Sequence, residues 1–290
     1  MKQLLVLSGK GGTGKTTVVS AFIRLANALA YADCDVDAPN LHLIMEENEA
    51  KRETDFHGMG KASIDQDVCI KCGACKALCR FDSVIEENGF SIDPYTCEGC
   101  GVCQAFCPAE AITMKARVDG QLILYSGEAV FSTAKLRMGS GTSGLLVTEV
   151  KKQLRSALKE DVDLAIIDGS PGIGCPVIAS LSGVDLVLIV AEPSLSGISD
   201  LERIVKTARV FHTKTVVCVN KADTSPTNTQ KIIDYCQSEG LLFMGQIPYD
   251  QCAVQAVNNG KTIVDMQCPA GFAVRDVFNQ TLKALYEIND

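Results

Sequence analysis

The stretch GKGGTGKT, residues 9–16, fits the pattern G-x-x-x-x-G-K-[ST]. It follows the apolar run LLVL, which predicts a buried strand, and it leads into TTVVSAFIRLA, which predicts a helix. Between a strand and a helix, such glycines let successive backbone N–H groups converge on phosphate oxygens at the positive helix end. A glycine-rich turn without a ligand is the alternative, but the order of strand, loop and helix favours a phosphate-binding loop.

Two side chains of this loop have distinct expected roles. Lys15 would reach the β- and γ-phosphates of a nucleotide, and the Thr16 hydroxyl would bind Mg²⁺. A phosphate loop needs only this second lysine, so the role of Lys10 is a separate question. The nucleotide contacts expected within the loop are Gly9, Gly11, Gly12, Thr13, Gly14, Lys15, Thr16 and Thr17.

Carboxylates follow two other apolar runs. LAIID ends in Asp168, an expected place for a group that holds the hydration shell of Mg²⁺, and Gly172 could offer a backbone N–H to the γ-phosphate. YAD is followed by further acids, Asp35 and Asp37. Solvated turn acids are the alternative interpretation of this second group. Beside a phosphate loop, we expect Asp33 to hold Mg²⁺ from its outer shell and Asp35 to position the attacking water.

Short apolar runs alternate with helical stretches over residues 2–60 and 118–290. Apolar strands separated by helices favour a parallel sheet covered on both faces. The expected fold is therefore α/β, a doubly wound and mostly parallel sheet, with a discontinuous nucleotide-binding domain over residues 1–61 and 118–290. The runs that predict its strands are QLLVLS, NALAYAD, LAIIDGS, DLVLIVAE, TVVCVN and LLFMGQIP.

Residues 62–117 predict a small inserted domain, because they contain eight of the fourteen cysteines in a twofold repeat, CIKCGACKALC and CEGCGVCQAFCP. Each repeat fits C-x₂-C-x₂-C-x₃-C, in which three thiolates bind one four-iron cluster and the fourth binds the other. Two zinc sites are the alternative, but zinc motifs usually separate their C-x₂-C pairs by longer loops. The expected ligand sets are Cys69, Cys72, Cys75 and Cys107 for one cluster, and Cys97, Cys100, Cys103 and Cys79 for the other.

Composition limits the partners and the compartment. The net charge of −8 and the pI near 5.0 argue against nucleic acid or an anionic membrane as the main partner. The first residues lack the pattern of a secretion signal, and no apolar run approaches the roughly 20 residues of a membrane span. We therefore expect a cytoplasmic protein with reduced thiols, without stable membrane insertion, whose clustered cysteines bind metal.

The stretches KGGTGKT, DCDVDAPNLHLIM and IIDGSPG together resemble the deviant Walker A ATPases of the MinD, Mrp and nitrogenase iron-protein group. The resemblance implies that Lys10 reaches across a dimer interface to the nucleotide of the other subunit. A second cation on the phosphates, supplied by a partner, would make hydrolysis depend on dimerisation. The expected assembly is a homodimer, or a heterodimer with a related ATPase. A solvated surface lysine is the alternative for Lys10.

The same resemblance places the base-binding residues. In VNKAD, Asn220 occupies the position that contacts the base, and IPYD brings Pro248, Tyr249 and Asp250 beside it. The N-K-x-D pattern that ends in Asp223 would suit guanine equally well. The resemblance favours ATP.

The inserted block resembles a bacterial two-cluster ferredoxin, with Arg80 where a proline commonly follows the fourth cysteine. Outside this block, Cys175 lies seven residues after Asp168, where nitrogenase iron proteins carry a ligand of a bridging cluster. The second cysteine of such a site is missing, since Ser140 lies near its position, and so is the C-terminal C-x-x-C of Mrp-type scaffolds. We expect Cys175 and the other five cysteines outside this block mainly to pack as small buried apolar residues. The C-terminal segment has too few cations for a MinD-type membrane helix.

Three functions fit these observations. The first is an ATP-gated electron carrier, in which hydrolysis switches a dimer or complex so that two 4Fe-4S clusters deliver electrons to a redox partner. The second is an ATPase that assists assembly or maturation of a metal or iron–sulfur cofactor in a client protein. The third is a MinD-like positioning module whose clusters report redox state. The missing scaffold cysteines weaken cluster transfer to a client, which favours the electron carrier.

Overall fold

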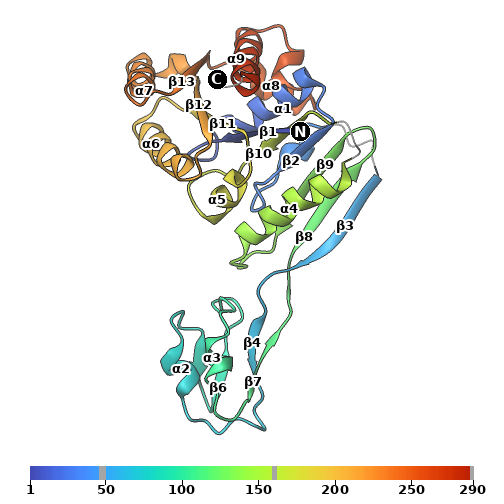
Figure 1. Ribbon diagram of the computed structural model, residues 1–290, viewed down its shortest axis with the longest axis vertical. Helices are drawn as coiled ribbons and strands as arrows, with labels where there is room; N and C mark the ends of the chain where they lie inside the picture. Colours follow the sequence, from blue (N-terminus) through green and yellow to red (C-terminus); the bar gives the residue numbers. More distant parts are fainter. Residues whose placement is uncertain (46–49, 159–161, 288–290) are drawn as a thin grey trace.

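The computed structural model describes residues 1–45, 50–158 and 162–287. Most of the chain surrounds one nine-stranded sheet of order β13-β12-β11-β1-β10-β2-β9-β8-β3 (Figure 1). The bounds of its strands are β1 Lys2–Leu7, β2 Ala30–Asp33, β3 Ala50–His57, β8 Val118–Ser126, β9 Val130–Leu136, β10 Leu164–Asp168, β11 Leu186–Ala191, β12 Lys214–Asn220 and β13 Leu242–Ile247.

Seven neighbouring strands of this sheet, from β13 to β9, are parallel. All six apolar runs predicted as strands are found among them, and the expectation of a mostly parallel α/β sheet is confirmed. The sequence did not predict the other end of the sheet, where β8 and β3 add antiparallel strands. β3 has the sequence AKRETDFH and is exposed except at Phe56, so this edge strand has no apolar run to reveal it.

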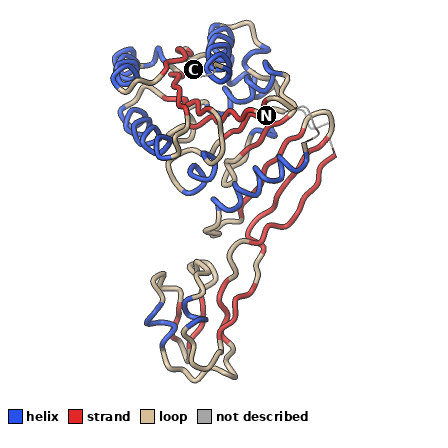
Figure 2. Tube along the Cα trace, in the orientation of Figure 1, coloured by secondary structure: helices blue, strands red, loops and turns tan. Residues whose placement is uncertain are grey.

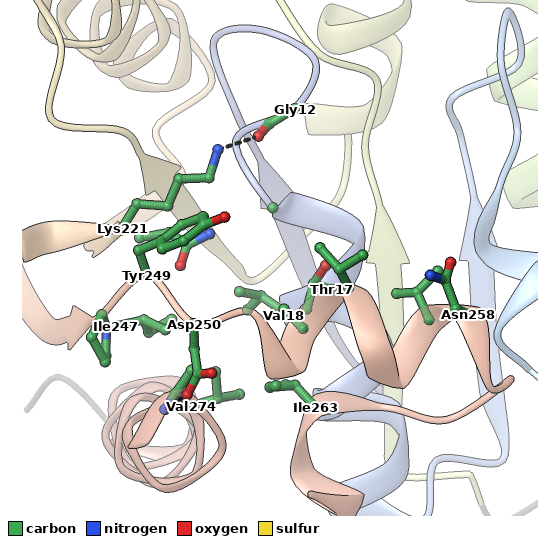
Figure 3. Close-up of a pocket in the computed structure, with 17 residues that line it drawn as sticks. Gly12, Thr17, Val18, Lys221, Ile247, Tyr249, Asp250, Asn258, Ile263 and Val274 are labelled. Atoms are coloured by element: carbon green, nitrogen blue, oxygen red, sulfur yellow. Dashed lines mark hydrogen bonds between the residues drawn. The ribbon is translucent and has the colours of Figure 1, made fainter. Parts of the chain in front are cut away.

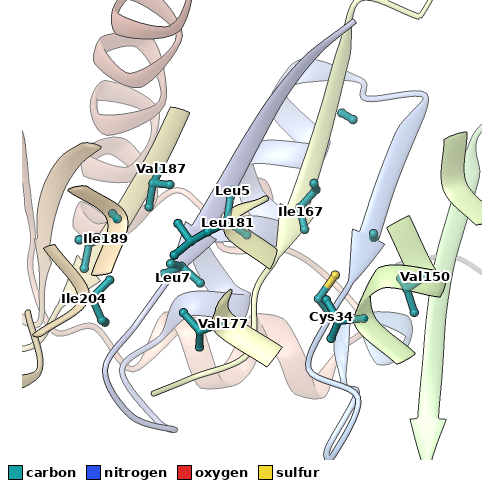
Figure 4. Packing of buried hydrophobic residues seen from close by; sticks show 14 of the residues in the cluster. Leu5, Leu7, Cys34, Val150, Ile167, Val177, Leu181, Val187, Ile189 and Ile204 are labelled. Carbon is teal, nitrogen blue, oxygen red and sulfur yellow. The ribbon is translucent and has the colours of Figure 1, made fainter. Parts of the chain in front are cut away.

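Helices cover both faces of the sheet, as the alternating side chains of the strands require. Leu5 and Leu7 of β1 pack on one face with residues from α4, α5, α6 and α7 (Figure 4). Leu4 and Val6 point to the other face, toward α1 and α9. The helix bounds are α1 Lys15–Ala26, α4 Ser143–Ala157, α5 Cys175–Leu181, α6 Leu195–Val210, α7 Pro226–Ser238, α8 Cys252–Asn258 and α9 Pro269–Tyr286. Within the described ranges, no helix combines the length and apolarity needed to cross a bilayer.

A small lobe extends from the far edge of the sheet, between β3 and β8 (Figures 1 and 2). We call residues 61–115 the cysteine lobe, since all eight cysteines of the sequence repeat lie in it. Its chain enters along β4 and leaves along the antiparallel β7, and a second antiparallel pair joins β5 to β6. The bounds are β4 Lys61–Ile64, α2 Ala74–Leu78, β5 Val84–Glu86, β6 Phe90–Ile92, α3 Val102–Ala105 and β7 Ile112–Lys115.

Candidate nucleotide site and cysteine lobe

The glycine-rich loop connects β1 to α1 at the carboxyl ends of the parallel strands, which is where this class of sheet binds ligands. Gly12 and Gly14 have φ angles of 80° and 90°, in the left-handed region that glycine adopts readily. A Cβ atom on Gly14 would lie 2.1 Å from the side-chain nitrogen of Asn220. Glycine at this position therefore allows the loop and the end of β12 to approach closely.

The predicted phosphate and magnesium ligands contact one another. The Lys15 ammonium forms an ion pair and hydrogen bond with Oδ1 of Asp168, and the Thr16 hydroxyl donates to Oδ2 at 2.8 Å. Asp168 is fully buried and Lys15 nearly so. Each charge thus compensates the other in the buried site. A nucleotide with Mg²⁺ offers both groups new partners of the right sign.

Asp33 is also fully buried, at the end of β2 beside β10. Its carboxylate accepts hydrogen bonds from the backbone N–H groups of Asp35, Asn40 and Leu41, at 2.9, 3.0 and 3.0 Å. Burial, followed by the charge of Asp168, raises the pKa of Asp33 to about 7. The carboxylate thus holds the loop after β2 in place, a contribution that the sequence did not predict.

Asp35 lies in this loop and is partly buried, while Asp37 is exposed. Burial raises the pKa of Asp35, whereas the nearby charge of Lys15 lowers it. Asp35 thus feels the charge of the lysine in the phosphate loop, as its expected role requires. The N–H of Gly172 donates to the carbonyl of Ser8 at 3.0 Å. That N–H is therefore engaged, and the loop must shift before it can reach a γ-phosphate.

Lys10 is 40% exposed and pairs with Glu192 at 2.8 Å. Its ammonium also lies 3.2 Å from the hydroxyl of Ser196 and 3.4 Å from that of Ser194, at the start of α6. The side chain is therefore held within its own chain, at the rim of the site. An exposed pair of this kind contributes only about 0–1 kcal/mol, so a partner's phosphates could compete for the ammonium.

A cavity of about 360 Å³ adjoins the phosphate loop (Figure 3). Gly12, Gly14 and Thr17 line one side, and apolar residues of α8 and α9 line much of the rest. All four predicted base contacts line it too: Asn220, Pro248, Tyr249 and Asp250. A mostly apolar cavity next to a phosphate loop is suited to the flat face of a nucleobase.

Polar contacts organise this cavity. The Asn220 amide donates to the carbonyl of Thr13 at 2.7 Å. Asp223, the acidic residue of the N-K-x-D pattern, accepts a 2.6 Å hydrogen bond from the backbone N–H of Tyr249. One carboxylate oxygen of Asp223 thus holds the loop that contains Tyr249 over the cavity. This structural role accounts for an acidic residue at position 223 without requiring that the site bind guanine.

Sequence reasoning missed two charged residues at the site. Lys221 donates to the carbonyl of Gly12 at 2.9 Å (Figure 3), and Glu192 accepts from Lys221 at 3.3 Å as well as pairing with Lys10. Both residues directly follow the buried parallel strands β11 and β12. Asp33 and Asp168 were predicted because each is a charged residue at the end of an apolar run. The same rule would have identified Lys221 and Glu192.

In the cysteine lobe, the eight cysteines line two small cavities, each with members of both repeats. The first cavity is lined by Cys69, Cys72, Cys75 and Cys107, and the second by Cys79, Cys97, Cys100 and Cys103. No three of these eight described cysteines have all their Sγ atoms within 4.8 Å of one another. Four sulfurs around a single zinc ion would lie about 3.8 Å apart, given Zn–S bonds of ~2.3 Å. The spacing of the thiols is therefore wider than a single metal ion requires.

The two repeats have the same backbone conformation. Lys71 and Gly99 have positive φ angles at equivalent positions, and so do Gly73 and Gly101, which precede α2 and α3. Backbone groups also point at the sulfurs. Burial opposes ionisation of Cys79, but hydrogen bonds from the backbone of Phe81 and Ser83 outweigh it and lower its pKa. The backbone thus favours the thiolate at Cys79, the form in which cysteine binds metal, whereas burial raises the pKa of Cys75 and of Cys103.

The other cysteines differ in exposure. Cys34, Cys218, Cys236 and Cys268 are buried and Cys252 is partly buried, which agrees with the expected packing role for most of them. Cys175 is exposed at the first residue of α5, next to Gly144 in α4. The expectation that Cys175 mainly packs against other residues was therefore wrong, because this residue is exposed.

A phosphate loop after a central parallel strand, with a buried carboxylate at the end of the neighbouring strand, defines a P-loop nucleotide-binding protein. Residues 4–263 match the CobQ/CobB/MinD/ParA nucleotide binding domain, and the chain belongs to this family. The resemblance to MinD-type ATPases is thus confirmed for the family and the fold.

Individual proteins agree with this assignment. An uncharacterized protein of Methanocaldococcus jannaschii is 33% identical over 225 residues, 76% of this chain and 78% of the relative. The iron-sulfur cluster carrier protein of Pyrococcus horikoshii is 24% identical over 311 residues, 99% of this chain and 87% of the relative. The structure of septum site-determining protein MinD from Pyrococcus horikoshii, complexed with Mg-ADP, has a TM-score of 0.56 at 16% identity, with 99% of each chain covered.

Proposed function

We propose that the protein is a Mg²⁺-dependent ATPase that uses a nucleotide-driven switch to control electron transfer through two 4Fe-4S clusters. The observation that carries the ATPase part is the contact of Lys15 and Thr16 with the buried Asp168 beside an apolar cavity. The Mg-ADP bound to the similar MinD structure supports the same ligand class. Asp223, already engaged with the loop over the cavity, supports adenine over guanine.

In the proposed reaction, water attacks the γ-phosphorus of ATP, the bond to the β-phosphate oxygen breaks, and ADP and phosphate leave. Lys15 compensates charge on the β- and γ-phosphates. Thr16 and Asp168, with Asp33 behind them, would hold Mg²⁺, whose charge stabilises the phosphates. Asp35 orients the attacking water. Lys10 of the other subunit of a dimer supplies a second positive charge to the phosphates.

For the cysteine lobe, we propose that residues 62–117 form a ferredoxin-type domain inserted into the ATPase domain of residues 1–61 and 118–290. The two cysteine sets, each drawn from both repeats, carry this proposal. Their wide spacing and the backbone hydrogen bonds to their sulfurs fit a cluster of several metal ions. When bound, each cluster can accept one electron from a low-potential donor and pass it to a redox partner.

We expect anaerobically purified protein to contain about eight iron and eight sulfide per chain. Cys107→Ser should damage the cluster of Cys69 rather than that of Cys97, because Cys107 lies in the cavity of Cys69. Electron paramagnetic resonance of the reduced protein distinguishes the two signals, with Cys72→Ser and Cys100→Ser as references for each cluster. Zinc at about two per chain, without visible charge-transfer absorption, would contradict the proposal.

Contacts at both ends of α4 outline a route from the nucleotide site to the lobe. α5 begins three residues after Gly172, and Lys151 of α4 donates to carbonyls at the end of α5, at 2.7 Å for Ser180 and 2.6 Å for Ser182. Before α4, Gly141 lies against Glu98 of the lobe, where an added Cβ would be 2.7 Å from the carboxylate. We propose that a shift of the Gly172 loop is transmitted along this route to the segment beside Cys97.

This connection predicts that the reduction potential of the cluster of Cys97 differs between the ADP state and a state with a non-hydrolysable ATP analogue. Potentiometric titration of the anaerobic protein measures it. Gly141→Ala, which crowds Glu98, should reduce the difference, while Lys206→Ala, at an exposed position of α6, serves as the control. Equal reduction potentials in both nucleotide states, with equal rates of electron transfer, would contradict the proposal that the nucleotide controls electron transfer.

The similarity to the iron-sulfur cluster carrier protein favours one second candidate, an ATPase that assists maturation of a client. The two functions differ in the fate of iron. An electron carrier keeps its clusters through many turnovers, whereas a maturation factor delivers iron and sulfide to a client. Incubation of the ⁵⁷Fe-labelled protein with an apo-ferredoxin and Mg-ATP separates them, because only transfer moves the label to the acceptor.

A further inference from the structure

Three side chains with metal-ligand chemistry converge at the edge of the nucleotide cavity. One carboxylate oxygen of Asp250 and the Sγ atoms of Cys252 and Cys268 all lie within 4.8 Å of one another. Asp250 follows β13, Cys252 begins α8, and Cys268 immediately precedes α9. Residues distant in sequence thus meet at one point, where Asp250 also lines the cavity.

Backbone contacts hold this group in place. The Asp250 carboxylate accepts one hydrogen bond from the N–H of Cys252 at 2.9 Å and another from the N–H of Ala270 at 3.3 Å. Each oxygen accepts one of them, and the thiols of Cys252 and Cys268 also hydrogen-bond to the carboxylate. The Cys268 side chain is 97% buried, given its 3% exposure, and it lies at the positive end of an 18-residue helix, which favours an anion there.

We propose that Asp250, Cys252 and Cys268 bind one Zn²⁺ ion, with water as the fourth ligand. Tetrahedral zinc with Zn–S bonds of about 2.3 Å places two sulfurs ~3.8 Å apart, and the two thiols lie no more than 4.8 Å apart, so they need to close by at most about 1 Å. Two thiolates and one carboxylate match the ligand preference of zinc, whereas Mg²⁺ requires an octahedron of oxygens. On binding, the ion displaces any protons on the two thiols into solvent.

Zinc in this position would cross-link the loop of residues 248–250 to the starts of α8 and α9. All three segments border the nucleotide cavity, so the ion would fix the cavity in its binding shape before a nucleotide arrives. The site does not depend on the proposed electron transfer, since none of its ligands lies in the cysteine lobe. It could be present whether or not the lobe binds iron.

The test uses the full chain, purified anaerobically with its iron content measured. The protein is incubated with zinc sulfate, dialysed against a weak chelator and analysed for zinc by mass spectrometry. We expect wild type to retain about one Zn²⁺ per chain more than either Cys252→Ser or Cys268→Ser. Cys236→Ser, a buried cysteine in α7, is the matched control and should retain the ion.

X-ray absorption at the zinc edge identifies the ligands. The expected shell has two sulfurs at about 2.3 Å and two lighter atoms at ~2.0–2.2 Å. A shell of four sulfurs that persists in Cys252→Ser would place the zinc in the cysteine lobe and overturn the proposal. Equal zinc in all variants would overturn it too. A Cys252–Cys268 disulfide, found by mass spectrometry of the alkylated anaerobic protein, would do the same. Cys252 is only partly buried, so its serine variant should fold even if Cys268→Ser does not.

Discussion

Replacing Lys15 with methionine is expected to abolish Mg-ATP binding and, separately, to destabilise the protein by about 3–5 kcal/mol. Binding is lost because the β- and γ-phosphates lose the cation that compensates their charge. Stability is lost because the ammonium is the ion-pair partner of Asp168, which is fully buried. Isothermal titration calorimetry measures the first effect, and denaturant unfolding of nucleotide-free protein measures the second.

The double variant Lys15→Met/Asp168→Asn separates these effects. Removing the unpaired buried charge should recover most of the stability, because a neutral amide can still accept the hydrogen bond from Thr16. Nucleotide binding should remain absent. Lys152→Met, at an exposed lysine paired with Glu149, is the control and should change neither property by more than about 0.5 kcal/mol. Wild-type affinity in Lys15→Met would contradict the assigned phosphate site.

The parts of the site that the sequence could predict depend on short-range pattern. Asp33 and Asp168 each end an apolar run, and parallel strands bring such ends to one edge of the sheet. The fixed spacing of the cysteines predicted which of them group around each of the two cavities, with Cys79 and Cys107 exchanged between repeats. In both cases a local geometric rule determines which groups can meet.

Other features depend on which segments become neighbours. The sequence of β3 is polar, and its place at the sheet edge comes from pairing with β8 rather than from its own periodicity. The engagement of Gly172 with Ser8 and the pairing of Lys10 with Glu192 each join separate loops. The resemblance implied a dimeric partner for Lys10, but no local pattern indicated that the same side chain has a partner within its own chain.

This internal pairing sharpens the expected effect of Lys10→Ala. The variant should bind Mg-ATP nearly as well as wild type, because Lys15 and the backbone N–H groups of the loop remain. Its exposed ion pair with Glu192 contributes little stability, so the protein should fold normally. Hydrolysis should fall by at least about 100-fold, since cations supplied from a partner contribute roughly 10³–10⁵ in related phosphoryl transfers. ATP-dependent dimerisation, measured by light scattering, should be lost as well.

Mixing tests whether Lys10 acts on the partner's nucleotide. Asp35→Asn should bind ATP but hydrolyse it slowly, so each variant alone is nearly inactive. In a mixed dimer, the Lys10→Ala chain has its own Asp35 and receives Lys10 from the Asp35→Asn chain. If all pairs associated equally, half of the dimers in an equal mixture would be mixed, each with one complete site, so activity should recover to at most about a quarter of wild type. A lysine that acts within its own chain predicts no recovery, because every site would then lack either Lys10 or Asp35.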